Sequence, residues 1–358
     1  MDDRSKAGLR GPVSVCRLDE SMFISDCTGN RCDTEPKEQT HWTITRYHLD
    51  GRIAQCHRNR RDGSEWTTTY TYDATGKLRE IETREATGSV SKTTLHYDQG
   101  GRLHRVTGRE GGGAENILQT FTYDEQHKTK TQYFHSMPGR AGSVALCYSV
   151  EGADAAYSAR GATSMTTVYD DQGRSMETLF HDSQQRVLSR VTLRYDDDGH
   201  VVEESQTTEM EEILPPEMHP RLNAAQLQSV KAIFGLEAGA QRSKQLHRYD
   251  TEGHRVETVL HVGTFGVEWK IMDYNQQGDL SEEKSVHDSK PPSIDDQGRV
   301  VEPSRPSAPK TPNSEARFSY QYDEHGNWTE RVVSTRQEPD KPFTVCGIDR
   351  RSLFYYPA

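Results

Sequence analysis

Apolar and aromatic residues recur at every second position along most of this chain. In the run WTTTYTY, Trp66, Tyr70 and Tyr72 fall on one face of an extended strand, and residues 318–322 repeat the arrangement. Side chains that alternate in this way are typical of β-strands with one apolar face. The pattern therefore predicts many short strands.

Most of these runs end in a five-residue segment that returns along the chain with small changes, such as YDATG at residues 72–76. The aspartate of such a segment accepts backbone hydrogen bonds, and the glycine three residues later adopts the left-handed backbone conformation. A type I turn that ends in such a glycine closes a three-residue hairpin loop. The predicted turn residues are Tyr47 and Gly51; Tyr72, Asp73 and Gly76; Tyr97, Asp98 and Gly101; Tyr123 and Asp124; Tyr148 and Gly152; Tyr169, Asp170 and Gly173; Tyr195, Asp196 and Gly199; Tyr249, Asp250 and Gly253; Tyr274 and Gly278; and Tyr322, Asp323 and Gly326.

The turn geometry also predicts a cross-strand pair at each hairpin, because the residue before the aspartate lies opposite the second residue after the glycine. The expected pairs are Tyr72 with Leu78, Tyr97 with Leu103, Tyr195 with Val201, Tyr274 with Leu280 and Tyr322 with Trp328. The first five tyrosines of the series stand 25 or 26 residues apart, which is enough for two strands and two turns. Since one hairpin cannot bury its apolar face alone, we expect the hairpins to stack into a continuous antiparallel sheet.

The YDxxG units, each followed by Arg, Lys or His and an apolar residue, resemble the YD repeats of the RHS family between Tyr47 and Trp328. The resemblance implies an all-β sheet of stacked hairpins that is open or spiralling, in exported or surface-associated bacterial proteins. Large members of that family often end in a toxin domain behind a boundary motif with an Asp-Pro step and a following Gly. That motif is missing after Trp328, so a toxin activity is not expected.

The composition is polar, with 32% hydrophobic residues, a mean hydropathy of −0.91 and a formal net charge of −11. Such averages approach those of disordered chains, but the periodic tyrosines favour a thin sheet. The negative charge and scattered basic residues disfavour nucleic acid as a partner. No run is long and apolar enough for a transmembrane helix, and residues 1–12 show no signal peptide and predict a flexible N-terminus.

One repeat array over residues 13–356 is expected, with two interruptions. The first, 211–240, contains an apolar stripe at Leu227, Val230 and Phe234, which predicts one helix over about residues 224–234. We interpret it as a cover for apolar sheet surface, with a docking helix or lid as the alternative. The second, 290–313, is rich in proline and predicts a loop, within which Asp295–Val301 keeps the turn pattern.

Six cysteines fit no strong metal-binding spacing. Cys27 and Cys32 flank a turn sequence that could bring their sulfurs close enough for a disulfide, and free thiols are an equal alternative. A zinc site from these two residues and His41 is a weaker third hypothesis. No cofactor or metal is predicted, because the acidic run 196–198 and the glycines 111–113 are explained as turns and loops.

Two functions remain open. The first is a noncatalytic scaffold or binding module, in which repeated Tyr and Arg side chains contact a polysaccharide or a protein. The alternative is a glycan-acting hydrolase whose carboxylates converge only in the folded chain, facing each other across a concave site. No catalytic motif is present, so no enzyme activity is predicted. The resemblance implies a cell-surface or extracellular location, with the cytoplasm as the alternative.

Overall fold

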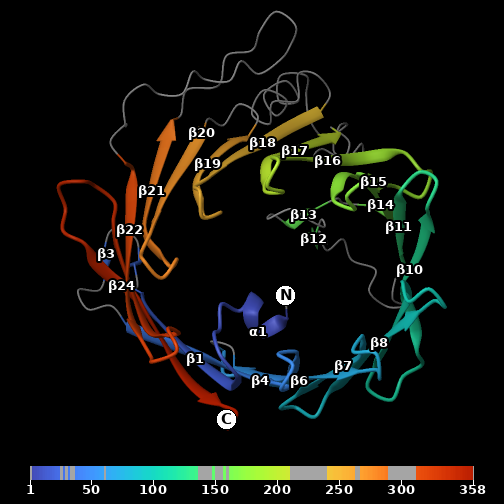
Figure 1. Ribbon diagram of the computed structural model, residues 1–358, viewed down its shortest axis with the longest axis horizontal. Coiled ribbons are helices and arrows are strands. Elements are labelled where there is room, and N and C mark those ends of the chain that lie inside the picture. The colour runs from blue at the N-terminus through green and yellow to red at the C-terminus, as the bar shows by residue number, and fades with distance from the viewer. Residues whose placement is uncertain are drawn as a thin grey trace, which may run out of the picture. The chain divides into compact units, whose positions relative to one another are not determined.

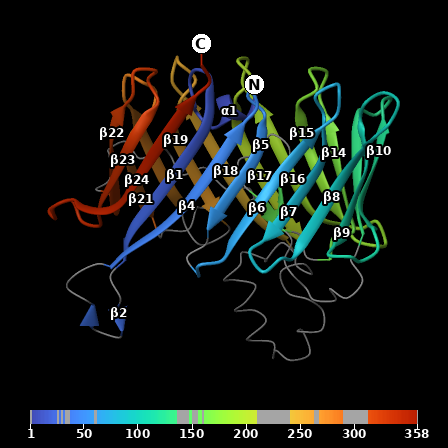
Figure 2. The ribbon, with the colours of Figure 1, turned by 90° about the horizontal axis from the view of Figure 1, so that it is seen from below.

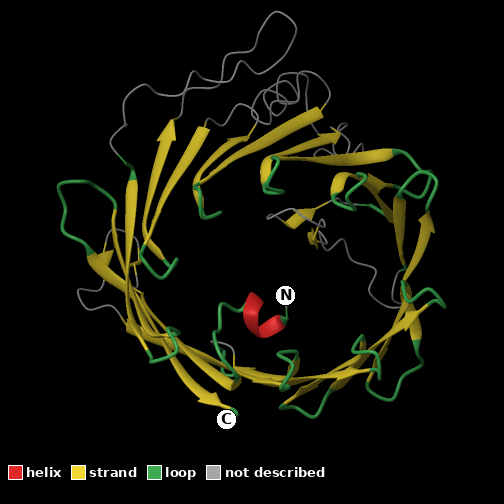
Figure 3. Cartoon of the chain, in the orientation of Figure 1, coloured by secondary structure: helices red, strands yellow, loops and turns green. Residues whose placement is uncertain are grey.

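The computed structural model describes residues 2–24, 27–28, 31–32, 37–59, 62–135, 147–149, 156–158, 161–209, 240–262, 267–288 and 312–357. Strands make up almost all of the regular structure, and α1 (Asp3–Lys6) is the only helix among these residues (Figure 3). The predicted helix near 224–234, the turn residue Gly152 and nearly all of the Pro-rich stretch 290–313 lie outside the described residues.

Twenty strands belong to one sheet, and the strands up to residue 181 are β1 (Val13–Ile24), β4 (Lys37–Tyr47), β5 (Ile53–Asn59), β6 (Glu65–Tyr72), β7 (Leu78–Glu85), β8 (Val90–Tyr97), β9 (Leu103–Glu110), β10 (Asn116–Asp124), β11 (Thr129–Phe134), β14 (Ser164–Tyr169) and β15 (Ser175–His181). The later strands are β16 (Val187–Tyr195), β17 (Val201–Glu209), β18 (Ala240–Tyr249), β19 (Arg255–Val262), β20 (Val267–Tyr274), β21 (Leu280–Asp288), β22 (Ser314–Tyr322), β23 (Trp328–Arg336) and β24 (Thr344–Tyr355). Two small hairpins pair β2 (Cys27–Thr28) with β3 (Arg31–Cys32) and β12 (Cys147–Ser149) with β13 (Ala156–Ser158).

The strand order of the main sheet corrects one part of the predicted fold class. The all-β antiparallel sheet is confirmed, but an open or spiralling sheet is wrong, because the order of the 20 strands closes on itself. The first strand, β1, pairs along one side with β24 and along the other with β4 (Figure 1). Strands near the two ends of the sequence are therefore joined through β1, and the hydrogen-bonding groups on both of its sides are used.

Four of the predicted cross-strand pairs appear in the register of the sheet, including Tyr97 with Leu103 and Tyr195 with Val201. Tyr72 lies opposite Leu78, and Tyr322 lies opposite Trp328. In both hairpins the register shifts by one residue just before the tyrosine, as a three-residue loop with an adjacent bulge requires.

The chain divides into two compact units. One comprises Met1–Ile117, Tyr274–Glu282 and Glu315–Ala358, and the other comprises Leu118–Asp273 and Glu283–Ser314. Within the first unit, β1, β4, β5 and β6 lie side by side, and α1 lies at the end of the sheet where the β4–β5 turn is found (Figure 2).

Among the residues that the structure describes, buried apolar side chains form three small clusters. The first unit buries Leu9, Val13, Cys16 and Tyr47 together. The second has one cluster around Phe180 and another around Trp269. This distribution fits the polar composition, because a sheet held by its backbone ladder and by small clusters needs few apolar residues.

Candidate functional site

The hairpin turns use the aspartate side chain as an internal acceptor. In the turn after β6, the Asp73 N–H donates to the Lys77 carbonyl at 2.9 Å, and the Gly76 N–H donates to the Asp73 carbonyl at 3.0 Å. The Asp73 carboxylate accepts from the N–H groups of Thr75 and Lys77 at 2.8 and 3.0 Å. Gly76 has φ of +89°, in the left-handed region that the pattern requires.

Most of the turn residues named from the sequence lie in this arrangement. The same pair of backbone hydrogen bonds joins the ends of six further turns, Asp98–Gly101, Asp170–Gly173, Asp196–Gly199, Asp250–Gly253, Asn275–Gly278 and Asp323–Gly326, each with its glycine at positive φ. The turn from Tyr47 also ends in a glycine at positive φ, Gly51, but its first hydrogen-bonding residue is His48. After Tyr123 and Asp124 the loop is one residue longer, and Lys128 takes the positive φ. Tyr148 lies in β12.

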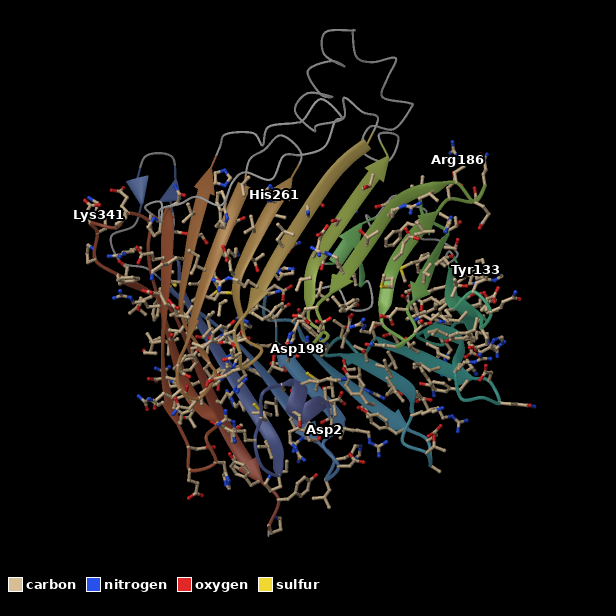
Figure 4. The ribbon with its side chains drawn as sticks, turned by 45° about the horizontal axis from the view of Figure 1, so that its top comes forward. Asp2, Tyr133, Arg186, Asp198, His261 and Lys341 are labelled. Carbon is tan, nitrogen blue, oxygen red and sulfur yellow. The ribbon has the colours of Figure 1, made fainter. Side chains whose placement is uncertain are left out.

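Two further turns with these backbone hydrogen bonds were not named from the sequence, Glu85–Gly88 and Asp182–Gln185, and the second uses an aspartate acceptor. Asp182 accepts from the N–H groups of Gln184 and Arg186, and Gln185 takes the positive φ of 63°. Figure 4 shows Arg186 at this turn, between β15 and β16. The usual tyrosine is His181 here and the usual glycine is Gln185, so the remaining signal was an Asp four residues before an Arg.

The repeated tyrosines link each hairpin to the one before it. The Tyr72 hydroxyl donates to the Ile53 carbonyl at 2.8 Å, and the Tyr97 hydroxyl donates to the Leu78 carbonyl at 2.7 Å. The acceptor in both cases is the first residue of the strand that returns from the preceding turn. The hydroxyls of Tyr195 and Tyr249 repeat this contact in the second unit. We call this series of contacts the tyrosine ladder.

In four hairpins, the Arg, Lys or His after the turn glycine covers the next tyrosine of the ladder. The Arg52 guanidinium lies 4.5 Å from the Tyr72 ring centroid, and the Arg174 guanidinium lies 4.6 Å from that of Tyr195. The Lys77 ammonium covers the Tyr97 ring at 5.3 Å, and the His200 ring stacks on the Tyr249 ring at 4.6 Å. These cation–π and stacking contacts explain the Arg, Lys or His in the repeat. They also occupy ring faces that a bound sugar would need.

The pKa shifts in the ladder agree with structural roles. Burial raises the pKa of Tyr72 to about 12, and burial likewise raises that of Tyr47 to about 12. Backbone hydrogen bonds from Arg102 and Arg174 lower the pKa values of Asp98 and Asp170, respectively. These aspartates are therefore committed as acceptors within their own turns.

Two candidate metal or thiol sites can be placed. Asp196, Asp198 and His200 hold potential ligand atoms within 4.8 Å of one another, at the turn where Figure 4 labels Asp198. The Asp196 carboxylate already accepts the His200 N–H at 2.8 Å, so the turn accounts for this cluster. Cys27 and Cys32 face each other in the β2–β3 register, and their bridging stays a prediction.

A groove of about 300 Å³ lies on one face of β18, β19, β20 and β21, within the second unit. Its lining residues are Gln245, Arg255, Thr258, Leu260, Glu268, Lys270, Met272 and Glu283. Paired residues on neighbouring strands share a face of the sheet, and the register accordingly sets Gln245, Leu260 and Glu268 in one row. Thr258 and Lys270 form the next row. The groove is thus assembled from side chains on four strands.

Charged groups dominate the rim of this groove. The Lys270 ammonium lies 4.0 Å from the Glu268 carboxylate and 3.8 Å from that of Glu283. Both distances are longer than the roughly 2.7–3.2 Å between donor and acceptor in a hydrogen bond. The two carboxylates can therefore accept further hydrogen bonds. At the end of the first row, Glu204 pairs with Gln245 and is only 1% exposed. Sequence reasoning missed the groove because its members come from separate strands with no shared motif.

Comparisons with known proteins do not place the chain in a family. No family model matches it, and no curated protein does either. Among solved structures, a porin-like protein from Bacteroides uniformis is 11% identical over 96% of this chain and 98% of that one, with a TM-score of 0.31. A porin-like protein from Bacteroides vulgatus is 11% identical over 98% of this chain and all of that one, with a TM-score of 0.16. The structure of TcdB2-TccC3-Cdc42 is 12% identical over 90% of this chain and 18% of that chain, with a TM-score of 0.28. At such TM-scores the likeness carries no argument about function.

The predicted membership of the RHS family is wrong. No family model supports it, and the sheet is closed where that resemblance implied an open or spiralling one. The YD spacing reflects hairpin chemistry that any stack of three-residue loops can use, so it does not by itself identify a family. The location outside the cell was expected from the same resemblance and stays a prediction. Among the described residues, no helix has the length and apolar character needed to cross a bilayer.

Proposed function

We propose that this chain is a noncatalytic binding protein, in which the tyrosine ladder holds the hairpins rigid and the groove on β18–β21 receives the ligand. The observation that carries the proposal is the groove itself. The groove has a volume of about 300 Å³, and charged groups on its rim are combined with the aliphatic side chains of Leu260 and Met272. Small-molecule sites use polar groups to orient the ligand and apolar groups to contact the rest of it.

The repeated tyrosines support the proposal because their side chains make contacts within the sheet. Their hydroxyls donate to neighbouring backbone carbonyls, and in four described hairpins a basic side chain or His ring covers the ring. Aromatic stacking on a polysaccharide needs an open ring face. Recognition therefore belongs to the groove more than to the repeated sheet surface.

The arrangement of charges in the groove favours binding over glycan hydrolysis. Glycosidases hold the scissile bond, or that bond and a water, between two carboxyl groups. Here the ammonium of Lys270 lies between Glu268 and Glu283, within 4.0 Å of both. The position that a substrate would occupy is thus taken by a side chain of the protein.

A groove-filling variant tests this function. Gln245→Trp should abolish binding to ligands found by screening the purified chain on glycan, peptide and metabolite panels, because the indole fills the groove. Gln55→Trp makes the same change at a half-buried position on β5 and should leave binding intact. Turnover of a glycan, peptide or ester that disappears in Glu268→Gln would overturn the proposal.

A further inference from the structure

The charged residues in the groove on β18–β21 indicate the charge of the ligand that the groove can bind. On its rim, Glu268 and Glu283 lie on either side of Lys270, and the row of Gln245, Leu260 and Glu268 ends in the buried Glu204. With Arg255, the charged residues that line the groove are two carboxylates and two cations, and Glu204 lies outside the lining as the partner of Gln245. The lining is therefore balanced in charge, and a cation is favoured locally, where Glu268 and Glu283 both lie within 4.0 Å of the Lys270 ammonium.

Lys270 shows what the two carboxylates can hold. Its side chain reaches from β20 to Glu283 on β21 and remains 44% exposed, while Glu268 and Glu283 are 37% and 30% exposed. Both contacts are long, so the Lys270 ammonium is a loosely held occupant. An ammonium from outside could approach the same carboxylates at hydrogen-bonding distance.

The groove floor suits the rest of such a ligand. Leu260 and the buried Met272 offer aliphatic surface, and Leu260 lies directly opposite Glu268 in the register. A straight methylene chain packs well on unbranched and branched aliphatic side chains, and methionine adapts to its shape.

We propose that this groove binds a primary ammonium on an aliphatic chain, as found in a lysine side chain or a free alkyl diamine. The ammonium lies between Glu268 and Glu283, displacing Lys270, and the methylene groups contact Leu260 and Met272. This assignment rests on the proposed role of the groove as the binding surface.

Calorimetric titration of the full chain with cadaverine, with Nα-acetyl-lysine methylamide and with glutarate tests the proposal. Cadaverine and the capped lysine should bind, and glutarate should not. Glu283→Gln should weaken cadaverine about fivefold, whereas Lys270→Met should strengthen it about fivefold by removing the competing ammonium. Binding of the capped lysine as well as cadaverine would point to a peptide side chain, and binding of cadaverine alone to a free diamine.

Matched controls lie outside the groove. Glu330→Gln on β23 and Lys92→Met on β8 remove one partner of an ion pair in the first unit and should change cadaverine affinity little. Glutarate binding that is lost in Lys270→Met would overturn the ligand class but leave the groove as a binding site. Cadaverine affinity unchanged by Glu283→Gln would also overturn the ligand class. Failure of all three probes, together with a silent Gln245→Trp, would overturn the proposed function as well.

Discussion

At the scale of single residues, the turns show which atoms the repeat depends on. Asn275 takes the place of the aspartate in the turn after β20, and its amide oxygen accepts from the N–H groups of Gln277 and Asp279 at 3.0 Å. In this turn an amide oxygen therefore replaces the carboxylate oxygen, so the charge of the aspartate is not required. The glycine is less replaceable, since its positive φ strains most side chains.

We expect Gly76→Val to destabilise the protein by about 1–2 kcal/mol, because valine is strained in the left-handed region. A Cβ at this position would also lie 2.9 Å from Arg52 Nη1. Urea unfolding measures the difference in free energy. Gly112→Val is the control, because Gly112 has open space around it and no positive φ. Equal stabilities of the two variants would contradict the role given to Gly76.

The contact between Arg174 and Tyr195 should appear as a coupling in a double-mutant cycle. The guanidinium lies 4.6 Å from the ring centroid, and cation–π pairs at partly exposed sites contribute about 0.5–1 kcal/mol. Unfolding of Arg174→Met, Tyr195→Leu and the double variant gives the coupling energy. A coupling near zero would show that the arginine only covers the ring without stabilising it.

At the scale of the elements, the tyrosine ladder ties one hairpin to the next through hydroxyl donors. Tyr72 and Tyr97 each reach a carbonyl of the preceding hairpin, so the ladder adds side-chain bonds to the backbone pairing. Each bond requires a protonated hydroxyl. The ladder is therefore sensitive to alkaline pH.

Alkaline unfolding should follow from the raised tyrosine pKa values. Burial raises those of Tyr47, Tyr72, Tyr320, Tyr322 and Tyr355 to about 12, against an ordinary value of 10.0. A folded-state pKa above the unfolded one gives stability that is complete below pH 10 and is lost as pH rises toward 12. Tyrosinate absorbance should show a late-titrating fraction that coincides with loss of the β-sheet circular dichroism signal. The urea-unfolded chain is the reference, and identical titrations of folded and unfolded chains would refute the expectation.

The first interruption of the array should be dispensable for strand pairing. β17 and β18 are paired up to Glu209 opposite Ala240, so the intervening chain connects neighbouring strand ends. Replacing residues 211–239 with a short Gly-Ser linker should preserve cooperative urea unfolding, followed by tryptophan fluorescence. Loss of cooperativity would show that the removed residues belong to the core.

At the scale of the whole molecule, β1 has a special place in the sheet. It pairs with β24 from Val13 opposite Tyr355 onward, and with β4 from Val15 opposite Arg46 onward. The residues before β1 add contacts to the turns, since the Arg10 N–H donates to the Asn327 side-chain oxygen at 2.6 Å. The N-terminal residues, predicted from sequence as a flexible N-terminus, thus contribute to the junction of the first and last strands.

Deleting residues 2–24 should expose the hydrogen-bonding edges of β4 and β24. Unpaired strand edges promote association between chains. We expect the truncated chain to form oligomers in sedimentation velocity, whereas deletion of residues 2–7 alone should not change the oligomeric state. A truncated chain that sediments as the full-length one does would contradict the role given to β1.

The sequence by itself determined the hairpin. An aspartate and a glycine three residues apart set the turn through contacts within five residues, and the loop length then fixes the opposite pair, as for Tyr72 and Leu78. The same local logic failed at Asp182, where Gln185 adopts the conformation that glycine usually takes. Only the tertiary structure decided that β1 joins β4 to β24 and that side chains from the four strands β18 to β21 line one groove. Those contacts depend on strand register and order accumulated over many hairpins, and no short stretch of sequence encodes that sum.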